Sequence, residues 1–291
     1  MYKPVYPNRQ DEIIHTAKYY NTKSGDCPNF LYYEDIDKDA IDLYITAFNN
    51  IFCIEYQIKT LRMFMKQKYN IIIVDNNNNL NPDVSKKTYE LCVKEGVTYI
   101  KAPDNYFQTV SFDPSMKLGS SMNWIYQNCV KKRQTKYFGY LDQDCFLISD
   151  CDMTEYLDSK NMYGQVCIGT KSKVAWNLHV IANFYRYDVV KDLQLDFRAS
   201  HHLQLDTGGS NYEILFKDYK SDDYQLPGSG HRFFDYDIGD PQKTFQYYSI
   251  LDGKWLHMGN SAYPALGQVD TKVAYIKGFL DGLLIKSQKF F

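Results

Sequence analysis

Two aspartates one residue apart follow an apolar and aromatic run in the segment YFGYLDQDCFLI, residues 137–148. In a strand, residues i and i+2 project to the same side about 6–7 Å apart, so Asp142 and Asp144 can face one site while Gln143 faces away. Two hard oxygen donors at that spacing suit Mn²⁺ or Mg²⁺, above all where a diphosphate supplies the remaining oxygens. The alternative is that both aspartates cap a turn after the strand, because Asx residues are common there.

The segments that precede the pair decide which alternative is favoured. Short β-branched or aromatic runs, typical of buried strands, alternate with stretches whose apolar residues recur at helical spacing. The strand-like runs are residues 41–48, 71–74, 97–103 and the run that ends at Asp142, and the helical stretches are 51–65, 84–94 and 113–129. This order predicts an α/β fold with a mainly parallel central sheet flanked by helices.

In a parallel sheet of this kind, ligands bind at the carboxyl ends of the strands. Three expected strand ends carry polar side chains: Thr46 with Asn49, Asp75 with Asn76, and Asp142 with Asp144. An Asp-x-Asp motif is weak by itself, but its place after the fourth strand of an alternating unit favours the metal interpretation over the turn cap. The sequence therefore predicts a metal and diphosphate site at this edge of the sheet.

Composition excludes other classes of protein. The 291-residue chain has 44% hydrophobic residues and a formal net charge of -2, so it lacks the basic excess that a nucleic-acid polymer would require of its partner. The seven cysteines are odd in number and none forms a Cys-x-x-Cys pair, which predicts buried free thiols and neither disulfides nor a zinc site. No apolar run reaches the length of a signal-peptide core or a membrane span. We therefore expect a cytoplasmic protein with no transmembrane segment.

The chain is expected to form one continuous domain in three parts. Residues 1–40 are polar and tyrosine-rich and predict an extension packed on the core. Residues 41–150 are expected to form the nucleotide-binding half, and residues 151–291 the half that holds the second substrate. Near the end, a helical apolar face made by Val273, Ile276, Leu280, Leu283 and Leu284 is expected to pack on the core. Homo-oligomerisation is left open.

A known family shares this order of segments. DLYITAFNN, YNIIIVDNNN, VTYIKAPDN, GSSMNWIY and YFGYLDQDCFLI together resemble the nucleotide-sugar-binding half of GT-A-fold glycosyltransferases. Within these, the chain is most similar to the inverting family 2, which includes bacterial rhamnosyltransferases with a Leu-Asp-Gln-Asp segment at this point. The resemblance covers residues 41–150. It implies a GT-A-type Rossmann-like sandwich and a hexosyl- or deoxyhexosyltransferase that requires Mn²⁺ or Mg²⁺.

The resemblance also implies roles for the polar strand ends. Thr46, with Asn49 beside it, would contact the nucleobase, and Asp75, followed by Asn76, would accept a hydrogen bond from the base. Asn123 matches an asparagine of the nucleotide site, Asp144 would bind the metal directly, and Asp142 would contact the ribose or the metal. The alternatives are an Asx turn through Asn76 for Asp75, and a polar position on a solvated helix face for Asn123.

The second half is expected to supply the catalytic base and the acceptor site. Asp206 precedes Gly208-Gly209 in LQLDTGGSNYEIL, and paired glycines allow positive φ or close backbone approach. An aspartate there could deprotonate an acceptor hydroxyl. The alternative is that Asp206 or Thr207 caps a helix from about Asn211.

The family's usual base lies in an acidic pair ahead of a helix, and FFDYDIGD offers Asp235 and Asp237 as competitors or acceptor contacts. His257, in KWLHMGN, is a competent ligand for Mn²⁺, and several GT-A enzymes use a histidine near this end of the domain; the alternative is a core histidine. Adjacent side chains diverge, so His201 and His202 are expected in a solvent-facing loop.

Together with these residues, the resemblance implies a metal-dependent glycosyltransferase of the inverting type. It would move a sugar from a UDP-, dTDP- or GDP-linked donor to a hydroxyl of a glycan, a glycolipid or a protein-linked acceptor. A lipid-linked acceptor would place it at a membrane surface. A sugar-nucleotide pyrophosphorylase would require a glycine-rich basic loop after the first strand, which TAFNNIFC lacks. An aspartate-nucleophile phosphatase would carry Thr or Val where Phe146 stands. An inactive sugar- or nucleotide-binding homologue is distinguished only by assay.

Overall fold

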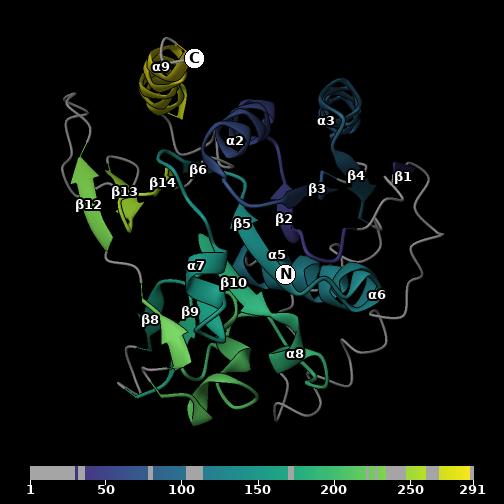
Figure 1. Cartoon of the computed structure of the whole chain (residues 1–291), viewed down its shortest axis with the longest axis vertical. Coiled ribbons are helices and arrows are strands. Elements are labelled where there is room, and N and C mark those ends of the chain that lie inside the picture. Colours follow the sequence, from purple (N-terminus) through teal and green to yellow (C-terminus); the bar gives the residue numbers. More distant parts are fainter. Residues whose placement is uncertain are drawn as a thin grey trace, which may run out of the picture.

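The centre of the protein is a sheet of eight strands (Figure 1). A computed structural model describes residues 30–31, 37–77, 81–102, 114–169, 174–220, 223–226, 229–233, 247–259 and 269–288. Strand β2 (Ile41–Ala47) lies between β3 (Tyr69–Asp75) and β5 (Tyr137–Asp142), and β4 (Thr98–Lys101) lies beyond β3. All four strands are parallel, which confirms the predicted mainly parallel core of an α/β fold.

Antiparallel strands extend this core on both sides. Strand β10 (Ala182–Arg186) pairs with β5, and the short strands β7 (Met162–Tyr163) and β11 (Tyr224–Gln225) follow it. At the other edge, β1 (Phe30–Leu31) pairs with β4. Most of the extension predicted for residues 1–40 lies outside the described residues.

The central strands are mostly apolar because helices cover both faces of the sheet. In β3, Ile71 and Ile73 point into one core cluster, while Ile72 and Val74 point into the other. Helices α2 (Ile51–Phe64) and α3 (Pro82–Glu95) pack on the first face, and α5 (Pro114–Ile125) packs on the second. The three helices predicted from apolar spacing are therefore present, and Figure 1 shows them on opposite sides of the strands.

Local signals explain where these helices begin and end. The side chain of Asn50 accepts a hydrogen bond from the amide of Cys53 (3.3 Å) and so caps α2. Gly96, with a φ of 58°, ends α3 in the left-handed conformation that glycine favours. Helix α5 continues through a π-helical turn (Tyr126–Val130) into α6 (Lys131–Arg133).

The order of the parallel strands creates a switch point. From β2 the chain passes to β3 and β4 on one side, and then through α5 and α6 to β5 on the other side. Crossovers that leave in opposite directions open a crevice at the carboxyl ends of the two strands concerned. Here these strands are β2 and β5, and Thr46 lies opposite Asp142 in their register.

A second, antiparallel sheet stands beside this crevice. Its strands are β12 (Ser229–Phe233), β13 (Tyr247–Leu251), β14 (Trp255–His257) and β6 (Cys145–Leu147), in that order. Helix α9 (Val269–Gln288) buries Ile276 and Leu280 against Cys53 and Phe146, which confirms that the terminal apolar face packs on the core. None of the helices that the structure describes has the length and apolarity to cross a membrane.

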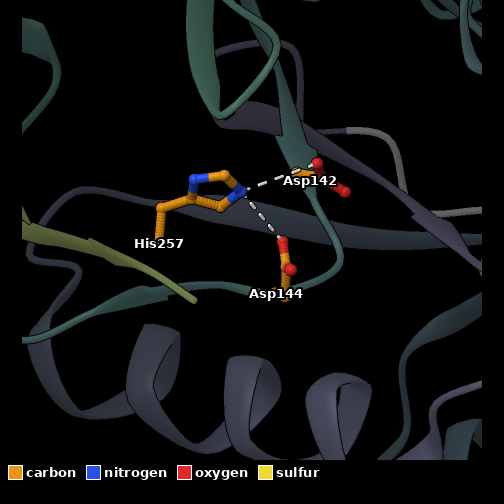
Figure 2. Close-up of side chains that lie close together, drawn as sticks. All are labelled: Asp142, Asp144 and His257. Atoms are coloured by element: carbon orange, nitrogen blue, oxygen red, sulfur yellow. Dashed lines mark ion pairs between the residues drawn. The ribbon is translucent and has the colours of Figure 1, made fainter. Parts of the chain in front are cut away.

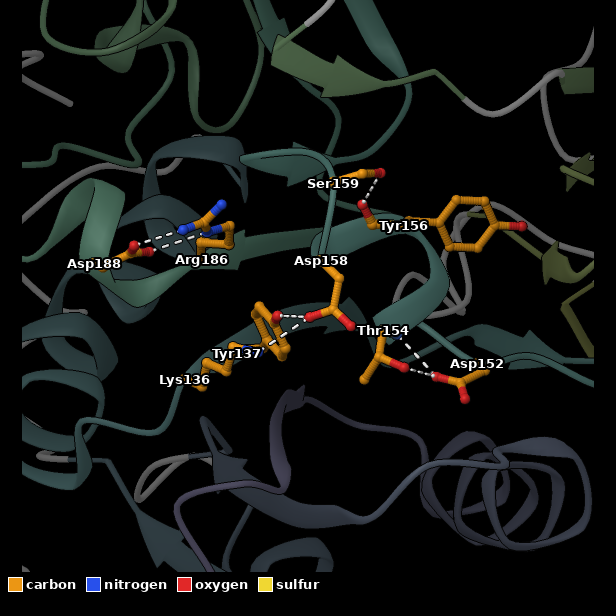
Figure 3. Close-up of polar contacts among 9 residues, drawn as sticks. All are labelled: Lys136, Tyr137, Asp152, Thr154, Tyr156, Asp158, Ser159, Arg186 and Asp188. Carbon is orange, nitrogen blue, oxygen red and sulfur yellow. Dashed lines mark hydrogen bonds and ion pairs between the residues drawn. The ribbon is translucent and has the colours of Figure 1, made fainter.

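The remaining elements are short. They are α7 (Thr154–Leu157), α8 (Tyr187–Val190) and the hairpin of β8 (Val166–Ile168) with β9 (Trp176–Leu178). Asp152 caps α7 by accepting hydrogen bonds from the backbone and hydroxyl of Thr154 (Figure 3). The six cysteines in the described part of the chain are free thiols and five of them are buried, as predicted.

The helix expected from about Asn211 is wrong. The chain instead forms two single 3₁₀ turns, η4 (Gly209–Asn211) and η5 (Phe216–Asp218). The amides of Gly208 and Ser210, just before this stretch, donate to the carbonyls of Phe197 and Arg198. From there on, the amides of residues 211, 212 and 214 donate three residues back, and those of Leu215 and Lys217 donate four and five residues back, so no regular run of α-helical bonds forms. The residue that precedes η4 is Gly208, which provides no side-chain cap, so Asp206 and Thr207 are not helix caps.

A buried ion pair ties α6 to the central strand. Arg133 donates from Nε and Nη2 to the two carboxylate oxygens of Asp42 at 2.6 and 2.9 Å, and both side chains are at most 3% exposed. Asn70 and Tyr44 also donate to Asp42. Sequence periodicity gives no sign of a charged residue on a strand buried on both faces.

We predict that Arg133→Met lowers the free energy of unfolding by about 3–5 kcal/mol, because it leaves the Asp42 carboxylate buried without its cation. The matched control is Arg186→Met, which removes the partly exposed pair with Asp188 (2.7 Å; Figure 3) and should cost at most about 1 kcal/mol. Urea unfolding measures both. Equal losses in the two variants would contradict the assignment.

Candidate metal centre and its surroundings

Three predicted metal ligands meet at the end of β5. Nε2 of His257 lies 3.2 Å from Oδ1 of Asp144 and 3.9 Å from Oδ2 of Asp142. One ligand atom from each residue lies within 4.8 Å of the others, and Figure 2 shows the imidazole directed at both carboxylates. Two carboxylate oxygens and one imidazole nitrogen are a donor set that fits Mn²⁺ or Mg²⁺. The arrangement can therefore hold a divalent cation.

Strand pairing brings His257 to the aspartates. In the register of β14 with β6, His257 lies opposite Cys145, the residue after Asp144. The amide of Met258 donates to the Asp144 carbonyl at 2.9 Å. The second sheet thus places an imidazole from near the end of the chain beside a turn from its middle.

Two glutamines fix the turn that carries the aspartates. Gln57 of α2, fully buried, donates from Nε2 to the carbonyls of Asp142 (2.9 Å) and Cys145 (2.8 Å). The amide oxygen of Gln143 accepts the Phe48 N–H at 2.8 Å, just after β2. The backbone between the two aspartates is therefore anchored to α2 and to the end of β2.

The charges of the cluster oppose one another. Burial and the neighbouring Asp144 carboxylate raise the pKa of Asp142 to about 7. Burial disfavours a charged His257, but Asp144 and Asp142 outweigh it and leave the pKa of this histidine above its ordinary value. Burial lowers the pKa of Lys272, on α9, to about 8, although Asp144 favours its charged form. A cation would offset the repulsion between the two carboxylates.

Asp206 lies on the other side of the site and is exposed. Its Oδ1 accepts the Thr207 N–H at 2.7 Å, and its charge contributes to the raised pKa of Asp142. It borders an open cavity of about 450 Å³ whose lining residues are Ser115, Ala199, His201, Gln204, Leu205 and Asp206. His201 and His202 are both exposed, as expected for a surface loop.

The paired glycines serve the packing of this segment. Gly208 has a φ of 90°, and a Cβ there would lie 3.2 Å from Nδ2 of Asn177. A Cβ on Gly209 would lie 2.4 Å from that of Leu205. The positive φ and the close approach expected from the sequence are both present, and the close neighbours are other segments of the chain.

The polar ends of β2 and β3 adjoin one another. The Asn76 amide donates to the Ala47 carbonyl (2.9 Å), and the Asn49 amide, at a φ of 57°, donates to the side chain of Asn77 (2.6 Å). Thr46 is buried beside Asp142. These residues form the wall of the crevice next to the metal centre.

Two residues predicted to contact the nucleotide, Asp75 and Asn123, have side chains that are hydrogen-bonded within the protein. Asp75 is fully buried; it accepts the Asn77 amide (2.8 Å), which forms the Asx turn considered as its alternative, and the Tyr99 hydroxyl (2.7 Å). Asn123 is buried, so the solvated-face alternative is wrong, and it joins Asp196 and Phe197 at 2.9 and 2.7 Å. Asp235 and Asp237 lie outside the described residues.

Three residues near the cluster were missed by sequence reasoning: Gln57, His179 and Lys272. Gln57 had a signal, because it stands on the apolar face of its helix between Ile54 and Ile58. His179 and Lys272 had none. Their positions follow from how β10 and α9 pack against distant parts of the chain.

Comparisons with known proteins give likenesses in structure only. No protein-family model matches the sequence, and no curated protein matches it. A mannosyltransferase, PcManGT from Pyrobaculum calidifontis in complex with GDP-Man and Mn²⁺, is similar at 12% identity and a TM-score of 0.41 over 74% of this chain. Galactosyltransferase LgtC, in complex with donor and acceptor sugar analogues, is similar at 11% identity and a TM-score of 0.37 over 52% of this chain.

The match spans about three fifths of each of those proteins, 62% of the mannosyltransferase and 59% of LgtC. At such low identity and TM-score, nothing about the chemistry of these two enzymes is transferred to this chain.

We predict that Gln57→Leu weakens Mn²⁺ binding by roughly 10- to 100-fold, because the turn that carries the two aspartates loses its anchor. The two orphaned carbonyls should also cost about 1–3 kcal/mol of stability. Calorimetric titration with Mn²⁺ measures the affinity. Gln67→Leu is the control, because the side chain of Gln67 accepts the Met153 N–H (3.1 Å) and, among the residues that the structure describes, forms no hydrogen bond with the cluster. A folded Gln57→Leu protein with unchanged Mn²⁺ affinity would refute the role of Gln57.

Proposed function

We propose that the protein is a metal-dependent glycosyltransferase that moves a sugar from a nucleotide-diphosphate sugar to a hydroxyl acceptor. The observation that carries this proposal is the cluster of Asp142, Asp144 and His257 at the switch point between β2 and β5. A cation centre at such a crevice suits a ligand that brings its own anionic oxygens. A nucleoside diphosphate is such a ligand.

Each part of the site has a role in this proposal. Asp144 and His257 hold the cation, and Asp142 shares it or contacts the ribose. When bound, the cation neutralises charge that develops on the departing diphosphate. The nucleoside lies along the crevice wall formed by Thr46, Asn49 and Asn76. Asp75 and Asn123 act as positioning residues, because their side chains are engaged within the fold.

The acceptor approaches from the side of Asp206. This aspartate is exposed at a cavity whose lining includes the polar residues Ser115, His201 and Gln204, which suit a hydroxyl-rich ligand. A carboxylate there can take the proton of the attacking hydroxyl. With Asp206 as base, transfer is a single displacement with inversion; with Asp206 only orienting the acceptor, the stereochemical outcome is open.

We predict that Asp144→Asn abolishes Mn²⁺-dependent thermal stabilisation by nucleotide sugars. It should reduce release of the nucleoside diphosphate about a hundredfold or more, because charge stabilisation by a metal is worth several kcal/mol. A panel of UDP-, dTDP- and GDP-sugars with Mn²⁺ provides both measurements. Asp150→Asn is the control, because Asp150 is an exposed aspartate that follows β6 and pairs with Lys66.

Either of two results would contradict the proposal: no donor of the panel stabilises the wild-type protein, or Asp144→Asn has the same turnover as the wild type. Binding of a donor without turnover for any acceptor would instead indicate an inactive sugar-nucleotide-binding protein.

We predict that Asp206→Asn keeps donor binding while transfer falls roughly 10²- to 10⁴-fold, the usual contribution of a general base. The amide oxygen of asparagine can still accept the Thr207 N–H, so the local backbone should be preserved. Donor affinity by calorimetry and transfer by product release are measured on the same sample. Asp218→Asn, another exposed aspartate, is the control; unimpaired transfer by Asp206→Asn would move the role to Asp235 or Asp237.

A further inference from the structure

We propose that His179 donates a hydrogen bond from Nε2 to the sugar that is transferred, and so helps to select the donor. This inference rests on the proposed function and adds a contact for the sugar itself, for which no residue has been assigned above.

The backbone of His179 is anchored on both sides. It lies directly after β9, in the short connection to β10, where its amide donates to the Gln165 carbonyl (2.7 Å). Its own carbonyl accepts from Nδ2 of Asn183, on β10, at 3.3 Å. The position of its Cα relative to the central sheet is therefore fixed.

A single residue ties the imidazole to the metal centre. The amide of Ile181 donates to Nδ1 of His179 at 3.4 Å, and the carbonyl of Ile181 accepts the backbone N–H of Asp142 at 3.1 Å. The two groups of Ile181 thus orient the histidine ring and the end of β5 together. Any shift of the ring would have to be accompanied by a shift of Asp142.

The hydrogen bond at Nδ1 also sets the tautomer. A nitrogen that accepts an N–H carries no proton, so the ring has its one N–H at Nε2. His179 is partly exposed, and within the described residues its Nε2 makes no hydrogen bond. The ring therefore presents an unused neutral donor to the site.

The ring adjoins the cation centre. Its centroid is 6.3 Å from that of His257, with an angle of 62° between the two rings. Burial and the neighbouring His257 lower the pKa of His179 to about 4, while the carboxylates of Asp206 and Asp144 oppose this shift. In a displacement, the transferred sugar lies against the leaving diphosphate, so a side chain that adjoins the cation centre is placed to contact the sugar.

The chemistry of the donor agrees with this place. A neutral N–H suits a sugar hydroxyl or ring oxygen, whereas the anionic diphosphate is matched by the cation and by Lys272. A fixed donor of this kind favours sugars with a hydroxyl at one position. With a sugar that lacks this hydroxyl, the N–H of His179 stays unpaired, and binding is weaker.

The test uses variants that separate the two ring nitrogens. Glutamine can bring an amide N–H to about the position of Nε2, whereas asparagine reaches only as far as Nδ1. The probes are the nucleotide sugar that stabilises the wild type most in the panel and its free nucleoside diphosphate, both with Mn²⁺. We expect His179→Asn to weaken nucleotide-sugar binding about tenfold, as for one lost hydrogen bond, and to leave nucleoside-diphosphate binding unchanged. We expect nucleotide-sugar binding by His179→Gln to be close to that of the wild type.

The controls separate this contact from a structural role. His202→Asn changes an exposed histidine that bonds Ser200 and should affect neither ligand. Equal weakening of both ligands by His179→Asn, or no weakening of either, would overturn the sugar contact while the proposed function stands. Failure of every nucleotide sugar to bind the wild type would overturn both.

Discussion

The site depends on holding two carboxylates together at the end of a buried strand. Asp142 and Asp144 repel each other, and removal from water disfavours their charged forms, which is why the pKa of Asp142 is raised to about 7. Such a turn would relax away from this arrangement unless the surrounding backbone held it. His257 and Lys272 supply part of the missing positive charge, and a divalent cation bound between the ligands would supply the rest.

The anchors of that turn come from four different parts of the chain. Gln57 of α2 holds two of its carbonyls, Phe48 after β2 binds Gln143, Ile181 before β10 binds Asp142, and Met258 after β14 binds Asp144. The elements around the switch point therefore also fix the conformation of the turn that carries the two aspartates. Each neighbouring element contributes at least one directional bond to the geometry of the two aspartates, so the cluster forms only when the sheet has closed around it.

The sequence was informative where one physical requirement acts on every residue of a segment. Burial on both faces makes β2 and β3 continuous apolar runs, and a single buried face gives α2, α3 and α5 their spacing, so the parallel core and its helices could be predicted. The Asp-x-Asp motif and His257 could be predicted as metal ligands because carboxylates and imidazole suit a divalent cation.

The remainder depends on contacts between distant segments. His179 becomes part of the site only through Ile181, and Lys272 only through the packing of α9. The segment from about Asn211 forms single 3₁₀ turns and no α-helix, and the residues just before it are held by residues 197–198, whose carbonyls accept the Gly208 and Ser210 amides. Asp75 suited a nucleotide contact by position, but the donors that surround it come from Asn77 and Tyr99, which local patterns do not place.

The two sides of the site are built by different means, and this difference bears on specificity. The cation side rests on paired strands, whose register leaves little freedom to His257 or Asp142. The side of Asp206 rests on an irregular segment that a buried polar network holds: Arg198 pairs with Asp196 at 2.7 Å, Asn123 joins Asp196, and Asn211 accepts the Asp196 amide at 2.7 Å. Gly119 of α5 allows this segment to approach, since a Cβ there would lie 2.3 Å from the Phe197 carbonyl oxygen. An irregular segment at the surface can change its course without disturbing the sheet. Under the proposed function, the choice of acceptor would therefore vary there, while handling of the diphosphate would stay tied to the core.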